Sequence, residues 1–129
     1  MKITGFNPAI LTSDLESVIH LFEDLGFQQK HARDGIASES VDDTVEATIR
    51  LKNEDGFAID INKANGFPRD VTLIRINVDD FDEAYKLLEE RGFCNCMGEG
   101  NLIVSPYIKG AHMASPSGFE VMLMQHLKG

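Results

Sequence analysis

The chain repeats one segment of its own sequence, and this repeat limits its fold more than any other feature. Residues 14–27, DLESVIHLFEDLGF, align without a gap on residues 80–93, DFDEAYKLLEERGF, at a constant offset of 66 residues. Identical residues recur at five positions of the alignment, which are Asp14 and Asp80, Leu21 and Leu87, Glu23 and Glu89, Gly26 and Gly92, and Phe27 and Phe93. Internal similarity of this kind indicates two copies of one supersecondary unit.

Both repeated segments are predicted to be helices, because apolar residues recur in them at the spacing of one helix face. These residues are Leu15, Val18, Ile19, Phe22 and Leu25 in the first segment and Phe81, Ala84, Tyr85 and Leu88 in the second. Capping boxes are predicted to begin the helices at Ser13-x-x-Glu16 and at Asp79-x-x-Asp82. Gly26 and Gly92 are predicted to end them in the left-handed conformation.

Predicted strands surround each helix. They are KITGFNPAIL, FQQKHAR, TVEATIRLK and GFAIDIN around the first helix, and VTLIRINV, FCNCM, YIKGAHMA and FEVMLMQ around the second. Apolar and polar residues alternate in TVEATIRLK and VTLIRINV, which predicts strands with one covered face. Each half therefore has the order β-α-β-β-β. We predict a single α+β domain with one module at about residues 1–63, a linker at about 64–70 and a second module at about 71–127.

Charge and composition exclude several classes of partner. The chain has 129 residues, a net charge of −9 and a pI near 4.7, which argue against binding to nucleic acid. Its N-terminus is too short and polar for a signal peptide, and no apolar run reaches the ~20 residues of a membrane span. We therefore expect a cytoplasmic protein that binds neither nucleic acid nor membranes. Cys94 and Cys96 are expected to be free thiols, because no second cysteine pair or H-x3-H motif accompanies them as metal ligands.

Two tandem modules, the first helix DLESVIHLFEDLGF and the final turn SPSGFEVML together resemble the vicinal oxygen chelate superfamily. That superfamily includes glyoxalase I, bleomycin-resistance proteins and extradiol dioxygenases, and the resemblance covers essentially the whole chain. It implies a cup-shaped, half-barrel mixed sheet with the helices on the outside, and modules that pair within or between chains, so we expect a homodimer. Catalytic members of the superfamily hold a divalent metal on the floor of the cup, but fold alone does not decide function.

The resemblance places the metal ligands of the superfamily in the first and last strands of each module. The matching positions in this sequence are Asn7, Asp60, Leu73 and Met122. Asp60 is the one good ligand among them, because leucine and methionine are poor donors for hard or borderline divalent cations. We therefore expect no metal cofactor.

The same positions define which strand residues face the interior of the predicted cup. The residues that we predict to bind a ligand are Asn7, Asp60, Arg75, Asn77, His112, Glu120 and Met122, and Glu46, Thr48 and Arg50 are expected on the same side. A few polar groups in an apolar lining are typical of small-molecule sites. Arg75 is predicted either to form an ion pair with Asp60 or Glu120, or to anchor a ligand carboxylate.

These features favour a metal-free protein that binds a small organic molecule, and its most specific form sequesters a toxic or antibiotic compound. Two alternatives stay open. One is a metal-dependent lyase, isomerase or dioxygenase with an atypical metal site around Asp60 and His112. The other is a regulatory or protein-interaction module whose cup is filled by its own side chains. No catalytic residue is assigned, because no serine lies in the context of a nucleophile elbow.

Overall fold

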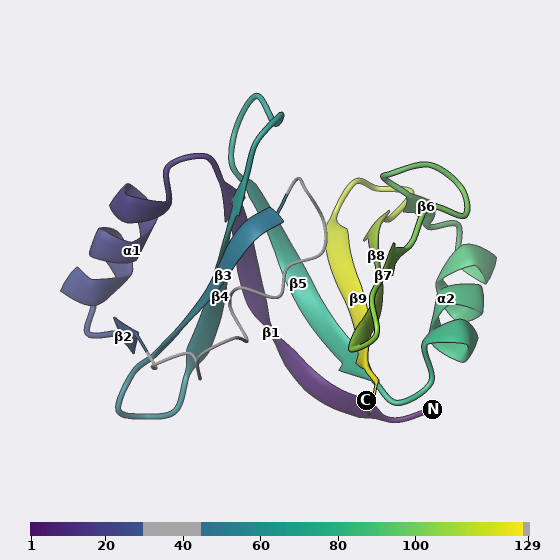
Figure 1. Cartoon of the computed structure of the whole chain (residues 1–129), viewed down its shortest axis with the longest axis horizontal. Coiled ribbons are helices and arrows are strands. Elements are labelled where there is room, and N and C mark those ends of the chain that lie inside the picture. The colour runs from purple at the N-terminus through teal and green to yellow at the C-terminus, as the bar shows by residue number, and fades with distance from the viewer. Residues whose placement is uncertain (30–44, 128–129) are drawn as a thin grey trace. The chain divides into compact units, whose positions relative to one another are not determined.

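The computed structural model describes residues 1–29 and 45–127, with the backbone alone for residues 45–47. The chain forms two compact units (Figure 1). The first unit comprises Asn7–Thr72, and the second unit comprises Met1–Phe6 and Leu73–Gly129. Each contains one helix and a set of parallel and antiparallel strands, so the predicted α+β fold with two βαβββ-like modules and a mixed sheet is confirmed.

In the first unit, strand β4 lies between two neighbours. The chain passes through β1 (Ile3–Thr12, of which residues 7–12 belong to this unit), α1 (Leu15–Asp24), β2 (Gln28–Gln29), β3 (Val45–Lys52) and β4 (Ala58–Ala64). Strand β1 pairs with β4 in parallel, β3 pairs with β4 antiparallel, and β2 pairs with β3 antiparallel. Of the predicted strand FQQKHAR, the part after Gln29 lies outside the described residues.

The second unit repeats this arrangement around β9. Its elements are β5 (Val71–Val78), α2 (Phe81–Glu90), β6 (Cys94–Asn95), β7 (Ile103–Val104), β8 (Ile108–Ala114) and β9 (Glu120–His126). Strand β5 pairs with β9 in parallel, β8 pairs with β9 antiparallel, and β6 and β7 both pair with β8 antiparallel. Strand β7 is too short to have been predicted from periodicity. Neither described helix, at 10 residues each, is long and apolar enough to cross a bilayer.

Each helix packs its predicted apolar stripe on one face of its own strands, except for Leu25, which follows the last residue of α1 and is 63% exposed. The core of the first unit joins Ile19 of α1 to strand residues Leu51, Ile59 and Ile61. The core of the second unit joins α2 residues Phe81 and Ala84 to strand residues Val78, Ala111, Met113, Val121 and Leu123. Ile74 and Ile76 pack against this second core, as the alternation in VTLIRINV predicts. The opposite face carries polar side chains such as Asp60 and His112 together with apolar ones such as Leu73 and Met124.

The predicted N-caps are wrong by one residue. The caps are Asp14, whose carboxylate accepts a hydrogen bond from the Ser17 amide at 3.3 Å, and Asp80, which accepts from the Glu83 amide at 3.1 Å. Asp79 is engaged elsewhere, because its carboxylate accepts a hydrogen bond from the Lys2 amide at 2.6 Å. The predicted left-handed glycines are confirmed, with φ of 99° at Gly26 and 90° at Gly92.

Replacing Asp80 with alanine is expected to lower the free energy of unfolding by about 1 kcal/mol, because the first turn of α2 loses its cap. The matched control is Asp80→Asn, which keeps an oxygen acceptor and caps about as well as aspartate. Urea denaturation of the two variants measures the difference. An asparagine variant as unstable as the alanine variant would show that the capping hydrogen bond is not the cause.

Candidate functional site

A buried carboxylate organises the polar face of the first unit. Asp60 on β4 is 1% exposed and lies opposite Arg50 on β3 and Ala9 on β1. Arg50 donates from Nε to Asp60 Oδ1 at 2.7 Å and from Nη2 to Oδ2 at 3.0 Å. Asn7 also donates to Oδ2, at 2.9 Å, and its own Oδ1 accepts from Arg50 Nη2 at 3.4 Å. The two oxygens of Asp60 are therefore held in a bidentate, charge-assisted network.

Alternation along the strands explains why this network forms on that face. Thr48 lies two residues before Arg50, and it accepts a hydrogen bond at 2.6 Å from Asn62, its partner in the register of β3 and β4. The intervening residue Ile49 packs on the opposite face, against the core beneath α1. The hydrogen bond with Asp60 raises the pKa of Arg50, outweighing the opposite effect of partial burial. This arginine therefore remains charged.

The second unit carries three rows of side chains in register across β5, β9 and β8. The central row is Arg75, Met122 and His112, the next row is Leu73, Glu120 and Ala114, and the third is Asn77, Met124 and Gly110. Gly110 leaves room for Met124, because a Cβ at this glycine would lie 2.3 Å from the methionine sulfur. The resulting face mixes two flexible methionines with charged and amide groups.

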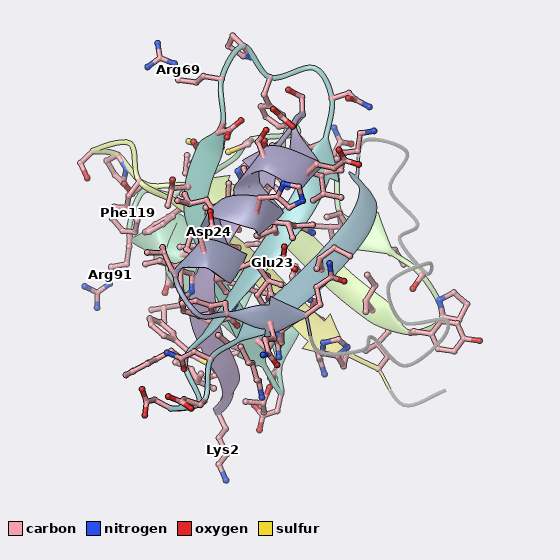
Figure 2. All side chains as sticks on the ribbon, turned by 90° about the vertical axis from the view of Figure 1, so that its left-hand side faces the viewer. Lys2, Glu23, Asp24, Arg69, Arg91 and Phe119 are labelled. Carbon is pink, nitrogen blue, oxygen red and sulfur yellow. The ribbon has the colours of Figure 1, made fainter. Side chains whose placement is uncertain are left out.

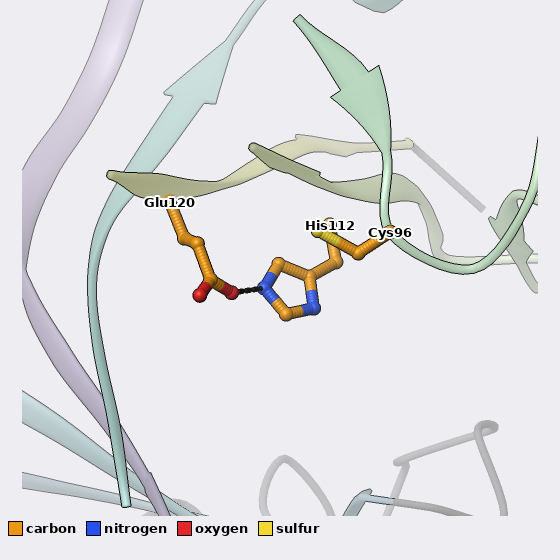
Figure 3. A group of neighbouring side chains, drawn as sticks. All are labelled: Cys96, His112 and Glu120. Atoms are coloured by element: carbon orange, nitrogen blue, oxygen red, sulfur yellow. Dashed lines mark hydrogen bonds and ion pairs between the residues drawn. The ribbon is translucent and has the colours of Figure 1, made fainter. Parts of the chain in front are cut away.

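His112 occupies the place in the second unit that Arg50 occupies in the first. Arg50 lies opposite Asp60 on β4, and His112 lies opposite Met122 on β9. Because Met122 offers no carboxylate, the imidazole turns instead to Glu120, the next residue on the same face, and their Nε2 and Oε1 atoms are hydrogen-bonded (Figure 3). His112 is 5% exposed, so this contact fixes the orientation of a buried ring.

Cys96 follows β6 and lies beside His112. Its amide donates a hydrogen bond to the His112 carbonyl at 2.8 Å, which continues the pairing of β6 with β8. Burial raises the pKa of the Cys96 thiol, and the nearby charges of Glu120 and Cys94 raise it further. Both cysteines are free thiols, as predicted. Sequence reasoning did not connect Cys96 with His112, because the connection depends on how β6 pairs.

The seven residues predicted to bind a ligand fall into two groups. Asn7 and Asp60 are in direct contact in the first unit. Arg75, Asn77, His112, Glu120 and Met122 share one face of the second unit, where Arg75 donates to Asn77 at 3.4 Å. Their role in ligand binding, and the predicted ion pair of Arg75, stay predictions. Arg50 was expected on the same side of the sheet as Asp60, but the sequence did not indicate which residue it contacts. The side chain of Glu46 lies outside the described part of the chain.

The side chains at the metal-ligand positions implied by the superfamily do not suit a divalent metal ion. In the first unit, both oxygens of Asp60 already accept hydrogen bonds from Arg50. Oδ2 of Asp60 also accepts a hydrogen bond from the Asn7 amide. In the second unit, Leu73 and Met122 supply no oxygen or imidazole ligand. A divalent ion at Asp60 would have to displace a guanidinium from a buried carboxylate. The residues at these four positions therefore do not fit the divalent ion of the superfamily.

Solved structures resemble this fold, whereas no protein-family model and no curated protein matches the chain. One is a glyoxalase/bleomycin resistance protein/dioxygenase superfamily member from Vibrio splendidus 12B01, with 19% identity, a TM-score of 0.60 and coverage of 96% of this chain and 99% of that one. A protein from Staphylococcus aureus has 15% identity, a TM-score of 0.62 and coverage of 97% and 98%. A glyoxalase I mutant from Zea mays has 14% identity, a TM-score of 0.61 and coverage of 98% of this chain and 44% of the maize chain.

The chain therefore has the fold of the glyoxalase/bleomycin resistance/dioxygenase superfamily over nearly its whole length. The structural resemblance predicted from the repeat and the final turn is confirmed. Because the identities are below 20%, this similarity shows the fold and neither a ligand nor a reaction.

Proposed function

We propose that this protein binds a small organic molecule on the face of the second unit that carries Arg75, Met122 and His112. The observation that supports the proposal most strongly is that these three side chains lie in one register row across three strands. A guanidinium and an imidazole therefore lie on either side of an unbranched, polarizable apolar side chain. Such a combination suits an organic ligand better than a bare ion.

The chemistry of this face defines a class of ligand. Met122 and Met124 adapt their shape to an apolar body, which suits aromatic or aliphatic groups. The guanidinium of Arg75 is a planar donor fork that matches a carboxylate or a carbonyl group. The proposed ligand therefore has an apolar body and at least one hydrogen-bond acceptor that carries full or partial negative charge.

In its specific form, the proposal is that the protein sequesters a toxic or antibiotic compound without chemically altering it. This form is supported by the poor fit of a metal at the superfamily positions and by a fold shared with a protein described as a glyoxalase/bleomycin resistance protein/dioxygenase superfamily member. We propose that it acts in the cytoplasm as a homodimer, as the resemblance implies.

Methyl resonances of the methionines test the site directly, because the chain has five methionines in distinct places. In a screen of carboxylated aromatic fragments against protein labelled at the methionine methyl groups, we expect shifts of Met122 and smaller shifts of Met124. Two methionines serve as internal controls, since Met113 is buried on the opposite face and Met97 lies outside strands β5, β9 and β8. Hits that move Met97 or Met113 and leave Met122 unchanged would place the ligand elsewhere.

The arginine is tested with a matched pair of variants. Arg75→Gln is expected to weaken a carboxylated hit at least about 10-fold, because a hydrogen bond to a charged group contributes ~1.5 kcal/mol or more. Arg69→Gln removes an exposed guanidinium that points away from the chain (Figure 2), and it should leave the affinity unchanged. Equal affinities of the two variants, measured by titration, would remove Arg75 from the site.

A further inference from the structure

Strands β8 and β9 and the turn after β6 bring a thiol, an imidazole and a carboxylate together in the second unit. The ligand atoms of Cys96, His112 and Glu120 all lie within 4.8 Å of one another. Figure 3 shows these side chains as one group, with the imidazole directed at the carboxylate. The residues come from three places in the sequence, and the pairing of β6 and β9 with β8 brings them side by side.

The burial of the three groups favours an ordered site that an ion from solvent can reach. His112 is buried, its backbone carbonyl accepts a hydrogen bond from the Cys96 amide, and its ring is hydrogen-bonded to Glu120. Cys96 is exposed and Glu120 is half-buried, so an ion from solvent reaches the group without unfolding it. A mixed set of sulfur, nitrogen and oxygen donors is the set that zinc and similar borderline ions accept.

Charge also favours a divalent ion at this place. A thiolate and a carboxylate together carry two negative charges, and a neutral imidazole adds none. One divalent cation therefore neutralises the group, which matters in a partly buried position where an uncompensated charge is costly. Three protein ligands leave one position open in a tetrahedral site.

We propose that Cys96, His112 and Glu120 form a binding site for a divalent transition-metal ion of the zinc class. On binding, the ion replaces the hydrogen bond between His112 and Glu120, and the Cys96 thiol loses its proton to solvent. The site lies wholly within the second unit and shares no residue with Asn7, Asp60, Leu73 or Met122, the positions implied by the superfamily. It goes beyond the proposed binding of an organic molecule and does not depend on it.

Cobalt(II) tests the site because it substitutes for zinc and reports its ligands in the absorption spectrum. Titration of the whole chain with Co²⁺ is expected to give one ion per chain, a thiolate-to-metal charge-transfer band in the near ultraviolet, and loss of that band on addition of Zn²⁺. Cys96→Ser should abolish the band and weaken binding at least about 100-fold, since loss of an outer-shell partner alone costs 10–100-fold. Glu120→Gln, which keeps the size of the side chain, should also weaken binding.

The neighbouring thiol provides the control. Cys94→Ser removes an exposed cysteine two positions away that is outside the three-residue group, and it should keep both the band and the affinity. Failure to bind Co²⁺, a spectrum without a thiolate band, or equal affinities of Cys96→Ser and the native chain would overturn the proposal. Fragment shifts of Met122 should persist in Cys96→Ser, so failure of the metal site and failure of organic-ligand binding are distinguishable.

Discussion

Replacing Phe81 with alanine is expected to lower the free energy of unfolding by about 3 to 5 kcal/mol, which is a large share of the 5–15 kcal/mol typical of a domain. Phe81 is 1% exposed and begins α2. Its ring lies 5.6 Å from that of Tyr85, and the Lys109 ammonium lies 5.3 Å from the ring centroid. The substitution therefore leaves a cavity where the helix meets the core of the second unit.

Leu87→Ala is the matched control for this cavity, because Leu87 lies on the same helix and is 40% exposed. It should cost less than about 1 kcal/mol in the same urea denaturation experiment. Leu15 holds the place of Phe81 in the first copy of the repeat and is only partly buried, so its replacement should cost an intermediate amount. Equal losses for Phe81 and Leu87 would contradict the assignment of Phe81 to the core.

The second large effect is expected at Asp60, where alanine should lower the free energy of unfolding by about 2 to 3 kcal/mol. Breaking a fully buried ion pair costs about 3–5 kcal/mol because the remaining charge is stranded. The loss here is smaller, since the Arg50 side chain is 43% exposed and can be solvated once its partner is gone. Asp60→Asn should fall between the native chain and the alanine variant, because one amide oxygen still accepts from Arg50.

A double-mutant cycle separates the pair from the other contacts of Asp60. Arg50→Ala should be destabilising in the native background and nearly neutral in the Asp60→Ala background, since the two side chains act as a unit. Asp70→Ala, at an exposed position of the first unit, is the control for loss of a carboxylate. Additive effects of the two substitutions would mean that the bidentate contact contributes little to stability.

Both helices could be predicted because the same sequence pattern occurs twice in the chain. The segments 14–27 and 80–93 share apolar spacing and a terminal glycine, and the structure places a helix in each. The caps were misplaced because Ser13 and Asp79 each precede an aspartate that also suits a cap. Sequence spacing does not show that Asp79 is already engaged by the backbone of Lys2.

The sequence predicts which face of a strand each site residue occupies, but it does not predict which residues contact one another. Alternation put Arg50 and Asp60 on the same side, and it put His112 and Glu120 on one side in the same way. Which residues meet depends on register, and a shift of register between Val45 and Ala47 in β3 is invisible in the sequence. The approach of Cys96 to His112 also needs the pairing of the short strand β6 with β8.

A native mass spectrum of gently purified protein, before and after incubation with fragments that shift Met122, tests the central claim most directly. The account predicts a dimer whose chains carry a non-covalent organic mass, and lower occupancy in Arg75→Gln than in Arg69→Gln. A spectrum with no organic mass, and with one divalent metal per chain that Asp60→Ala removes and Cys96→Ser retains, would contradict it. That result would restore a metal-dependent enzyme with its metal at the positions implied by the superfamily.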